Sequence, residues 1–353
     1  MIRRETRPVD VGAMLVGGGA PISIQSMTNT DTRDVAATLA QITCLADAGC
    51  EIVRVAIPAR DALDAFGAIC AASVLPVVAD VHFDHTIAIE AARLGAAKLR
   101  INPGNIGDMT RVDDIIVAAG EAGIPIRIGV NAGSLAPEYR DLSVPLAEKL
   151  AASAVAFCHH FEARGFTDIV VSAKASSVLA TVDAYRRLSR EIDYPLHIGV
   201  TEAGTSLSGT VKSSIGLGIL LDEGIGDTLR VSLTADPVEE VRVGWEILGA
   251  LDIRRRSPEL VSCPTCGRCQ VDLIPIAEEV ARLLSERRTP IKVAVMGCVV
   301  NGPGEARDAD IGVAAGKGVG VIFAKGRTVR KVPESEIVSA LMAEIDSFGD
   351  TRG

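Results

Sequence analysis

The chain has 353 residues, of which 48% are hydrophobic and only 3% are aromatic, and its formal net charge at pH 7 is −9. Nucleic-acid-binding proteins usually carry a basic surface with stacking aromatic side chains, so we expect no nucleic-acid partner. No apolar run reaches the ~18 residues of a membrane span, and the first ten residues lack the apolar core of a secretion signal. We therefore expect a cytoplasmic protein that does not enter a membrane.

Short apolar runs rich in β-branched residues alternate with helical patterns along the first 253 residues. Strands are expected at 22–28, 52–58, 77–83, 98–104, 126–133, 168–174, 196–204 and 228–233. Such alternation predicts a parallel sheet, and this number of repeats predicts a (β/α)8 TIM barrel. A doubly wound open sheet is the alternative, but it needs a reversal of strand order that a sequence does not display.

A charged segment that ends in proline, residues 252–258, separates the repeats from the rest of the chain. We expect a barrel domain over 1–253 and a smaller α/β domain over 258–353, which is within the usual size of a domain. In this second domain the patterns predict a helix at 274–287, a strand at 291–296, a hairpin within 310–332 and a helix at 334–347.

Cationic side chains recur near the C-terminal ends of the predicted strands, where barrel active sites lie. They are Arg54, His82, Arg100, Arg127, Lys174, His197 and Arg230, with Ser26, Thr28, Asn102, Asn131 and Ser232 as neutral polar residues and Asp80, Asp84 and Glu202 as acids. A lone arginine in an apolar strand often forms a structural ion pair, but the acids are too few to neutralise all these cations. Guanidinium groups suit phosphate oxygens, so the pattern predicts an anionic, phosphorylated ligand.

The second domain contains a group of cysteines, Cys263, Cys266 and Cys269 in SCPTCGRCQ, followed by Cys298 in MGCVVNGPGE. Thiolates at this spacing can hold zinc or a [4Fe–4S] cluster, and three cysteines with a weaker ligand can hold a cluster with one reactive iron. Unligated thiols that pack as small apolar residues are the simplest alternative. Clustered cysteines in a chain expected in a reducing compartment favour a metal.

Eight motifs together give a resemblance to a known family: QSMTNT, RVAIP, DVHF, LRINPGN, RIGVN, GVTEAG, SCPTCGR and GCVVNGPGE. They resemble the bacterial 4-hydroxy-3-methylbut-2-enyl diphosphate synthases of the non-mevalonate isoprenoid pathway, over nearly the whole chain. The resemblance implies an iron–sulfur oxidoreductase that opens the ring of 2-C-methyl-D-erythritol 2,4-cyclodiphosphate and removes water. Two electrons would pass through a [4Fe–4S] cluster.

The same resemblance implies the roles of individual residues. The cluster ligands would be Cys263, Cys266, Cys298 and Glu305, whose carboxylate can be displaced so that one iron is open to substrate. The substrate-binding residues would be Arg54, His82, Arg100, Asn102, Arg127, Asn131, Lys174, Arg230 and Ser232. Glu202 is the candidate proton donor, with His82 as the alternative. Cys269 departs from the family pattern and is interpreted as a bystander; the alternative is that it is a ligand and Glu305 is not.

The resemblance also implies partners. Flavodoxin or ferredoxin would supply the electrons, because the sequence has no flavin- or nicotinamide-binding fingerprint. The linker leaves the barrel at the end opposite the expected active site, so the second domain could cap the barrel of a neighbouring chain; the resemblance implies a head-to-tail homodimer of that kind. Two other functions remain open: a pterin-type barrel synthase with structural zinc, and a non-catalytic iron–sulfur carrier or sensor.

Overall fold

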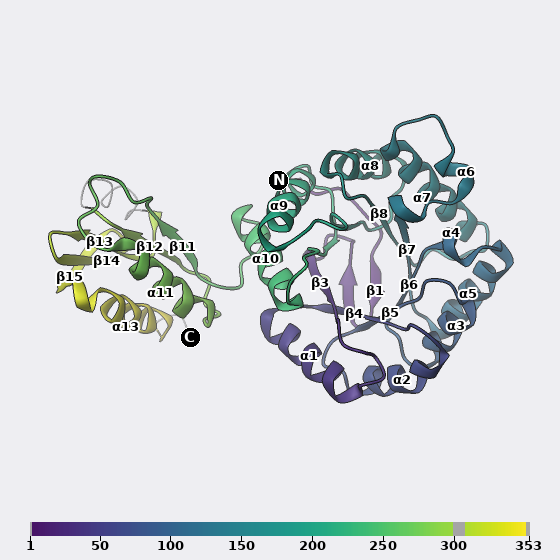
Figure 1. Ribbon diagram of the computed structural model, residues 1–353, viewed down its shortest axis with the longest axis horizontal. Coiled ribbons are helices and arrows are strands. Elements are labelled where there is room, and N and C mark those ends of the chain that lie inside the picture. The colour runs from purple at the N-terminus through teal and green to yellow at the C-terminus, as the bar shows by residue number, and fades with distance from the viewer. Residues whose placement is uncertain (1, 299–307, 351–353) are drawn as a thin grey trace. The chain divides into compact units, whose positions relative to one another are not determined.

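The computed structural model describes residues 2–298 and 308–350, and the side chains as far as residue 347. The chain divides into two compact units, Met1–Arg254 and Arg255–Gly353 (Figure 1). In the described ranges no helix is long and apolar enough to cross a membrane. Each unit has a hydrophobic core of its own.

The first unit is built on a closed sheet of parallel strands. These are β3 (Ser23–Met27), β4 (Ile52–Ala56), β5 (Val77–Asp80), β6 (Lys98–Ile101), β7 (Ile126–Asn131), β8 (Ile169–Lys174), β9 (His197–Ile198) and β10 (Thr228–Leu229). Their order is β8-β7-β6-β5-β4-β3-β10-β9, and a parallel bridge between Val171 and Leu196 joins β8 to the segment before β9. The predicted TIM barrel is confirmed, although most strands are shorter than expected; β4, for example, ends at Ala56 and β10 at Leu229.

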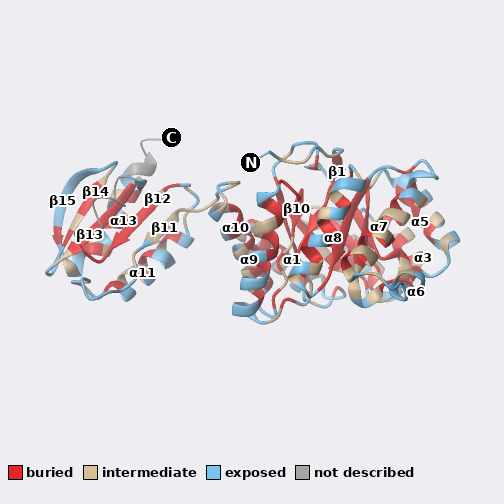
Figure 2. Ribbon diagram, turned by 90° about the horizontal axis from the view of Figure 1, so that it is seen from above, coloured by how far each residue is buried: buried red, intermediate tan, exposed pale blue. Residues whose placement is uncertain are grey.

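Helices surround this sheet, as Figure 1 shows. They are α1 (Val35–Ala48), α2 (Leu63–Ala72), α3 (His85–Arg93), α5 (Met109–Ala122), α7 (Leu146–Glu162), α8 (Val178–Glu191), α9 (Ser206–Asp222) and α10 (Pro237–Ala250), with short α4 (Pro103–Ile106) and α6 (Pro137–Arg140) after β6 and β7. Several begin at a carboxylate that accepts a backbone N–H, as Asp34 does for α1 and Asp236 for α10. The apolar faces of the helices cover the outward side chains of the strands, which are buried (Figure 2).

A short hairpin closes the N-terminal end of the barrel. Its strands, β1 (Val9–Val11) and β2 (Met14–Val16), pair antiparallel. Val9, Val11 and Val16 form one buried apolar cluster with inward side chains near the starts of β4, β5 and β8, among them Ile52 and Val78. This cluster is the floor of the barrel. The hairpin was not expected from the sequence, because strands of three residues give too short a pattern. It leaves only the C-terminal ends of the strands open for a site.

The second unit is a mixed sheet with two helices. Its strands are β11 (Glu259–Ser262), β12 (Lys292–Met296), β13 (Ile311–Gly316), β14 (Val319–Ala324) and β15 (Arg327–Pro333), paired in that order, and its helices are α11 (Leu273–Ser285) and α13 (Ile337–Asp350). β11, β12 and β13 run parallel, whereas β13, β14 and β15 alternate. The segment predicted as one hairpin therefore forms three strands, since tight turns at Lys317–Gly318 and Lys325–Gly326 reverse it twice.

The hairpin makes a testable contribution to stability. Val11→Ala removes two methyl groups from a fully buried position, so we expect the free energy of unfolding of the barrel to fall by about 1–3 kcal/mol. Leu15→Ala, in the same hairpin but 47% exposed, is the matched control and should change it by less than about 0.5 kcal/mol. Trp245 is the single tryptophan and lies in α10, so denaturant unfolding followed by its fluorescence reports on the barrel. Equal effects of the two substitutions would mean that the hairpin does not seal the floor.

Candidate functional site

The inward face of the barrel strands is polar and cationic near their C-terminal ends. Alternate residues of a strand face opposite sides, and the apolar residues beside the arginines, such as Val53 and Leu99, pack outward under the helices. Arg54, Arg100 and Arg127 therefore point inward, and the ladder sets Arg100 beside Arg127. Arg100 and Arg127 are 4% and 2% exposed, so these charges are enclosed rather than solvated.

Asp80 at the end of β5 links several of these groups. Its carboxylate lies 3.1 Å from Arg100 Nη1, 3.4 Å from His82 Nε2 and 3.7 Å from Arg54 Nε. Burial alone would raise the pKa of Asp80, but the charge of Arg54, the hydrogen bond from His82 and the charge of Arg100 hold it well below its usual range. The amide of Asn131, with its oxygen toward Arg100, accepts from Nη2 at 3.0 Å. Asp80 thus fixes the positions of Arg54, Arg100 and His82.

Arg230 is held by a carboxylate that the strand pattern did not reveal. Its Nη2 donates to both oxygens of Glu240, each at 3.1 Å, and Glu240 also accepts from the backbone N–H of Leu233 at 3.0 Å. Glu240 comes from α10 and is only 4% exposed. In the sequence, Glu240 could have been recognised as an acidic residue on the apolar face of that helix, beside Val241 and Trp245, which are also buried.

Arg127 and Lys174 have no carboxylate partner among the residues described. Arg127 donates from Nη1 to Ser172 Oγ at 3.2 Å, while its Nε and Nη2 have no hydrogen-bond partner. Burial and the neighbouring arginines lower the pKa of both Arg127 and Lys174. A Cβ at Gly199 would lie 2.7 Å from Lys174 Nζ, so glycine there leaves room for the ammonium group. The expectation that the acids do not neutralise every cation therefore holds for this pair.

The neutral polar residues lie around the same end of the barrel. Asn102 caps α4, accepts from Gly104 N–H at 3.2 Å and donates to Ser134 Oγ at 2.8 Å. Ser232 is half-buried beyond the end of β10. Asn102 directly follows β6, which carries Arg100, and Ser232 lies two residues after Arg230, so both lie near the cations at the C-terminal end of the barrel.

Glu202 follows β9 and is exposed, with no contact to the arginines among the described interactions. Its φ of +52° is in the left-handed region, which non-glycine residues rarely adopt. Such backbone strain is concentrated at functional sites. The structure therefore gathers Arg54, His82, Arg100 and Asn131 around Asp80, and it leaves Glu202 apart from that group.

The cysteines of the second unit lie at the ends of two adjacent parallel strands. Cys263 follows β11, Cys298 lies two residues after β12, and the ladder pairs Ser262 with Val295. The backbone N–H of Gly297 donates to Cys263 Sγ at 3.2 Å. Hydrogen bonds from the backbone and side chain of Arg268 lower the pKa of Cys266, which favours its thiolate.

Cys269 is placed differently. Its Sγ donates to Val271 O at 3.3 Å, and a Cβ at Gly297 would lie 2.5 Å from that sulfur. Glu305 lies outside the described residues. In the part of the chain that is described, which omits 299–307, no three Cys, His, Asp or Glu side chains are close enough together to hold a metal ion.

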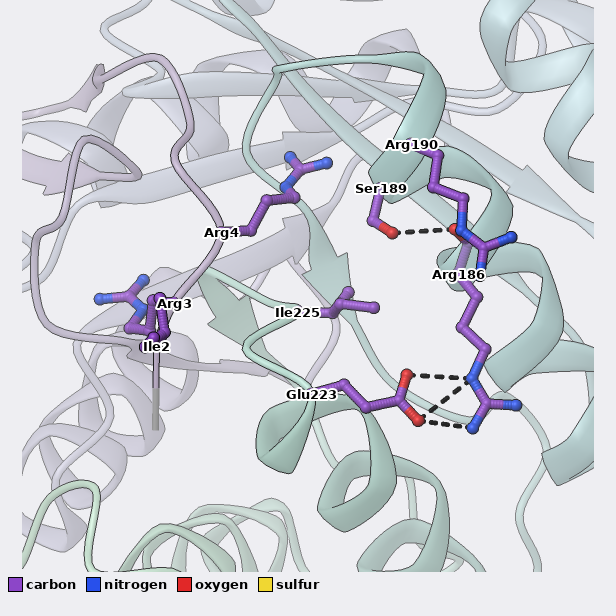
Figure 3. A pocket seen from close by; sticks show the side chains of 8 residues that line it. All are labelled: Ile2, Arg3, Arg4, Arg186, Ser189, Arg190, Glu223 and Ile225. Carbon is purple, nitrogen blue, oxygen red and sulfur yellow. Dashed lines mark hydrogen bonds and ion pairs between the residues drawn. The ribbon is translucent and has the colours of Figure 1, made fainter.

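A further pocket of about 290 Å³ lies at the other end of the barrel, near the starts of the strands. Figure 3 shows its lining, which includes Arg3, Arg4, Arg186 and Glu223. Arg186 is paired with Glu223, Arg4 donates to Ile192 O at 2.9 Å, and Arg3 donates to Asp227 at 3.2 Å. Arg3 and Arg4 hold the N-terminal segment against the barrel and Arg186 joins α8 to the end of α9, so this pocket is not the candidate site.

Solved structures of dihydropteroate synthases share the barrel. The enzyme from Stenotrophomonas maltophilia has 13% sequence identity and a TM-score of 0.52, with 70% of this chain and 98% of that chain covered. The Yersinia pestis enzyme also has 13% identity, with a TM-score of 0.51 and coverage of 69% and 98%. At this identity the likeness shows the fold alone.

Curated relatives match almost from end to end. Two proteins named 4-hydroxy-3-methylbut-2-en-1-yl diphosphate synthase (flavodoxin) are 56% and 54% identical to this chain. The first, from Geobacter sulfurreducens, covers 98% of this chain and 99% of its own length, and the second, from Clostridium acetobutylicum, covers 99% and 100%.

Family models match both units of the chain. The GcpE TIM-barrel domain matches residues 6–245, and the GcpE protein C-terminal domain matches residues 259–347. With these matches over most of its length, and with the cation-lined barrel and the cysteine-bearing second unit in place, the chain belongs to the GcpE family.

Proposed function

We propose that this chain is a 4-hydroxy-3-methylbut-2-en-1-yl diphosphate synthase that uses reduced flavodoxin and acts on 2-C-methyl-D-erythritol 2,4-cyclodiphosphate. The observation that carries the proposal is the pair of buried cations, Arg127 and Lys174, for which the described part of the chain provides no carboxylate partner. Buried charge is costly unless it is compensated, and a diphosphate supplies the missing negative charge. The names of the relatives support this function over a pterin-type synthase.

Binding falls to residues that the fold already holds in position. Arg54, Arg100, Arg127, Lys174 and Arg230 bind the phosphoryl oxygens, since guanidinium groups present planar pairs of donors. His82, Asn102, Asn131 and Ser232 complete the site with neutral hydrogen bonds. Asp80 and Glu240 orient the arginines, so little rotamer entropy is lost when the ligand binds.

The reaction consumes two electrons and two protons for each substrate. One ring C–O bond to phosphate opens, a hydroxyl leaves as water, and a carbon–carbon double bond forms. Glu202 protonates the leaving hydroxyl, with His82 as the alternative donor. Its exposed carboxylate and its left-handed backbone after β9 support this role.

The second unit would hold a [4Fe–4S] cluster through Cys263, Cys266, Cys298 and Glu305. The donor chemistry fits, because soft thiolates at the ends of β11 and β12 are the usual ligands of such clusters, and the N–H of Gly297 already bonds Cys263 Sγ. When bound, the cluster supplies the electrons and a Lewis-acidic iron. Cys269 bonds Val271 O instead, which supports its assignment as a bystander.

The electron donor is flavodoxin, the protein in the relatives' names, rather than ferredoxin. Free cysteines at each of the eight cysteine positions agree with a reducing, cytoplasmic location. A head-to-tail homodimer, in which the second unit of one chain serves the barrel of its partner, completes the proposal.

Cys298 and Cys269 provide a matched test of the cluster ligands. Cys298→Ser should abolish the broad brown absorption and the iron and acid-labile sulfide of an anaerobic preparation, because a hydroxyl replaces thiolate poorly as an iron ligand. Cys269→Ser should keep all three and should retain turnover. If Cys269→Ser also loses the cluster, Cys269 is a ligand and not a bystander; if Cys298→Ser keeps it, Cys298 is not a ligand.

Arg127 tests the phosphate site. Arg127→Ala removes charge-assisted hydrogen bonds worth about 1.5–3 kcal/mol each, so the dissociation constant of the cyclodiphosphate should rise about 10- to 100-fold. The cluster spectrum should not change, and the melting temperature should not fall, because an unpaired buried charge is lost. Arg187→Ala, which breaks a surface ion pair with Glu148, is the control for both readouts. Unchanged affinity together with a lower melting temperature would make Arg127 a structural residue only.

Co-expression of two impaired chains tests the head-to-tail dimer, when activity is assayed at a substrate concentration far below the dissociation constant of the Arg127→Ala chain. In a mixed dimer of Arg127→Ala and Cys298→Ser chains, one site combines the intact barrel of one chain with the intact cluster unit of the other. Random pairing should then restore about a quarter of the wild-type activity. A site formed within one chain would remain inactive in every pairing, so absence of rescue despite dimers in ultracentrifugation would refute the exchange.

A further inference from the structure

Beneath the arginines, the interior of the barrel is polar where most TIM barrels are filled by Val, Ile and Leu. The side chains there are at most 1% exposed, and their polar atoms have no hydrogen-bond partner among the described residues: Ser23, Gln25, Lys98, His197 and Thr228. Buried polar groups are nearly always paired. In this layer, Lys98 is the side chain whose positive charge would most strongly attract an anionic ligand bound above it.

Lys98 lies between the floor and the cations. It is on β6, two residues before Arg100 and on the same inward side, and it pairs with Val78, which belongs to the apolar floor. The hairpin below contributes Val9 and Val11 to that floor, and its Asp10 is exposed to solvent on the other side. Lys98 therefore has an apolar surface on one side and the binding site on the other.

The groups that face Lys98 are almost all cationic. Strand by strand they are Arg54 on β4, Asp80 on β5, Arg100 on β6, Arg127 on β7, Lys174 on β8, His197 on β9 and, after β10, Arg230. Asp80 is already engaged by Arg54, Arg100 and His82, and Glu240 is engaged by Arg230. The ammonium group of Lys98 has no carboxylate of its own.

This environment opposes the charged form of Lys98. Burial, followed by the charges of Arg127 and Arg54, lowers its pKa to about 7. The ring nitrogens of His197 are held uncharged in the same way, since burial and the neighbouring cations lower its pKa well below the usual value. A ligand with two negative charges above the layer offsets the repulsion from Arg127 and Arg54, so its binding favours the charged form of Lys98.

We propose that Lys98 takes up one proton from solvent when a diphosphate occupies the cations above it. The inference rests on the proposed function only for the identity of that diphosphate. The neutral amine becomes an ammonium ion, no other bond changes, and the positive charge adds to the attraction that holds the ligand. One proton thus enters the barrel with a substrate whose reduction consumes protons.

Calorimetry of the cluster-loaded chain, without reductant, measures this proton. Titration with the cyclodiphosphate near pH 7 in two buffers of different ionisation enthalpy should give an uptake of a fraction of a proton per site attributable to Lys98, and this uptake should rise toward about one as the pH increases. Because the bound form holds the extra proton, wild-type affinity should fall as pH rises above 7, by at most about tenfold per pH unit.

Two variants isolate the contribution of Lys98. Lys98→Met has no group that can take up the proton, and Lys98→Arg is already charged before the ligand binds. Both variants should therefore bind the ligand without the proton uptake attributed to Lys98. Subtracting the proton uptake of a variant from that of the wild type removes the protons that the ligand itself or Lys174 exchanges. Uptake that is equal in wild type and in both variants would overturn the inference, as would wild-type binding with no uptake.

Inorganic pyrophosphate separates this inference from the proposed function. Pyrophosphate binding with Lys98-dependent uptake, without binding of the cyclodiphosphate, would contradict the proposed substrate and support the role of Lys98. Binding of both ligands with no Lys98-dependent uptake would contradict the role of Lys98 and leave the substrate in place.

Discussion

Unneutralised positive charge inside a closed barrel is the constraint on which the site depends. Arg100, Arg127 and Lys174 are buried, and the only carboxylates described at their level are Asp80 and Glu240, which are already bound to arginines. A fold accepts such charge only where surrounding structure is stable enough to hold it. The helices that cover the outer faces of the strands and the valine floor of the hairpin supply that stability, so the barrel can keep its charges for a ligand.

The two units offer different kinds of binding group. The barrel presents guanidinium and ammonium groups on parallel strands, which suit phosphate oxygens. The second unit presents thiols at the ends of β11 and β12, which suit iron, and the backbone N–H of Gly297 already bonds one of them. Neither unit alone has both the anion site and the electron path that a reductive ring opening needs.

The sequence predicted the barrel and most of the cationic residues because both follow short-range patterns. Alternating apolar runs mark the strands, and each arginine lies within such a run. The partners of those arginines could not be read in this way, since Glu240 reaches Arg230 from a helix and Asp80 bridges several strands. The three-residue strands of the floor were missed because tertiary packing rather than local periodicity forms them. The third strand of the expected C-terminal hairpin, β15, was missed because it is almost entirely exposed and forms through its backbone ladder to β14. The predicted ligand Glu305 lies outside the described residues and stays a prediction.

The most direct test of the central claim is anaerobic turnover of 2-C-methyl-D-erythritol 2,4-cyclodiphosphate by the cluster-loaded chain with a strong chemical reductant. The account predicts one 4-hydroxy-3-methylbut-2-enyl diphosphate for each two electrons consumed, detected by mass spectrometry. A fully loaded sample that binds the cyclodiphosphate and accepts electrons, yet never opens the ring, would contradict it.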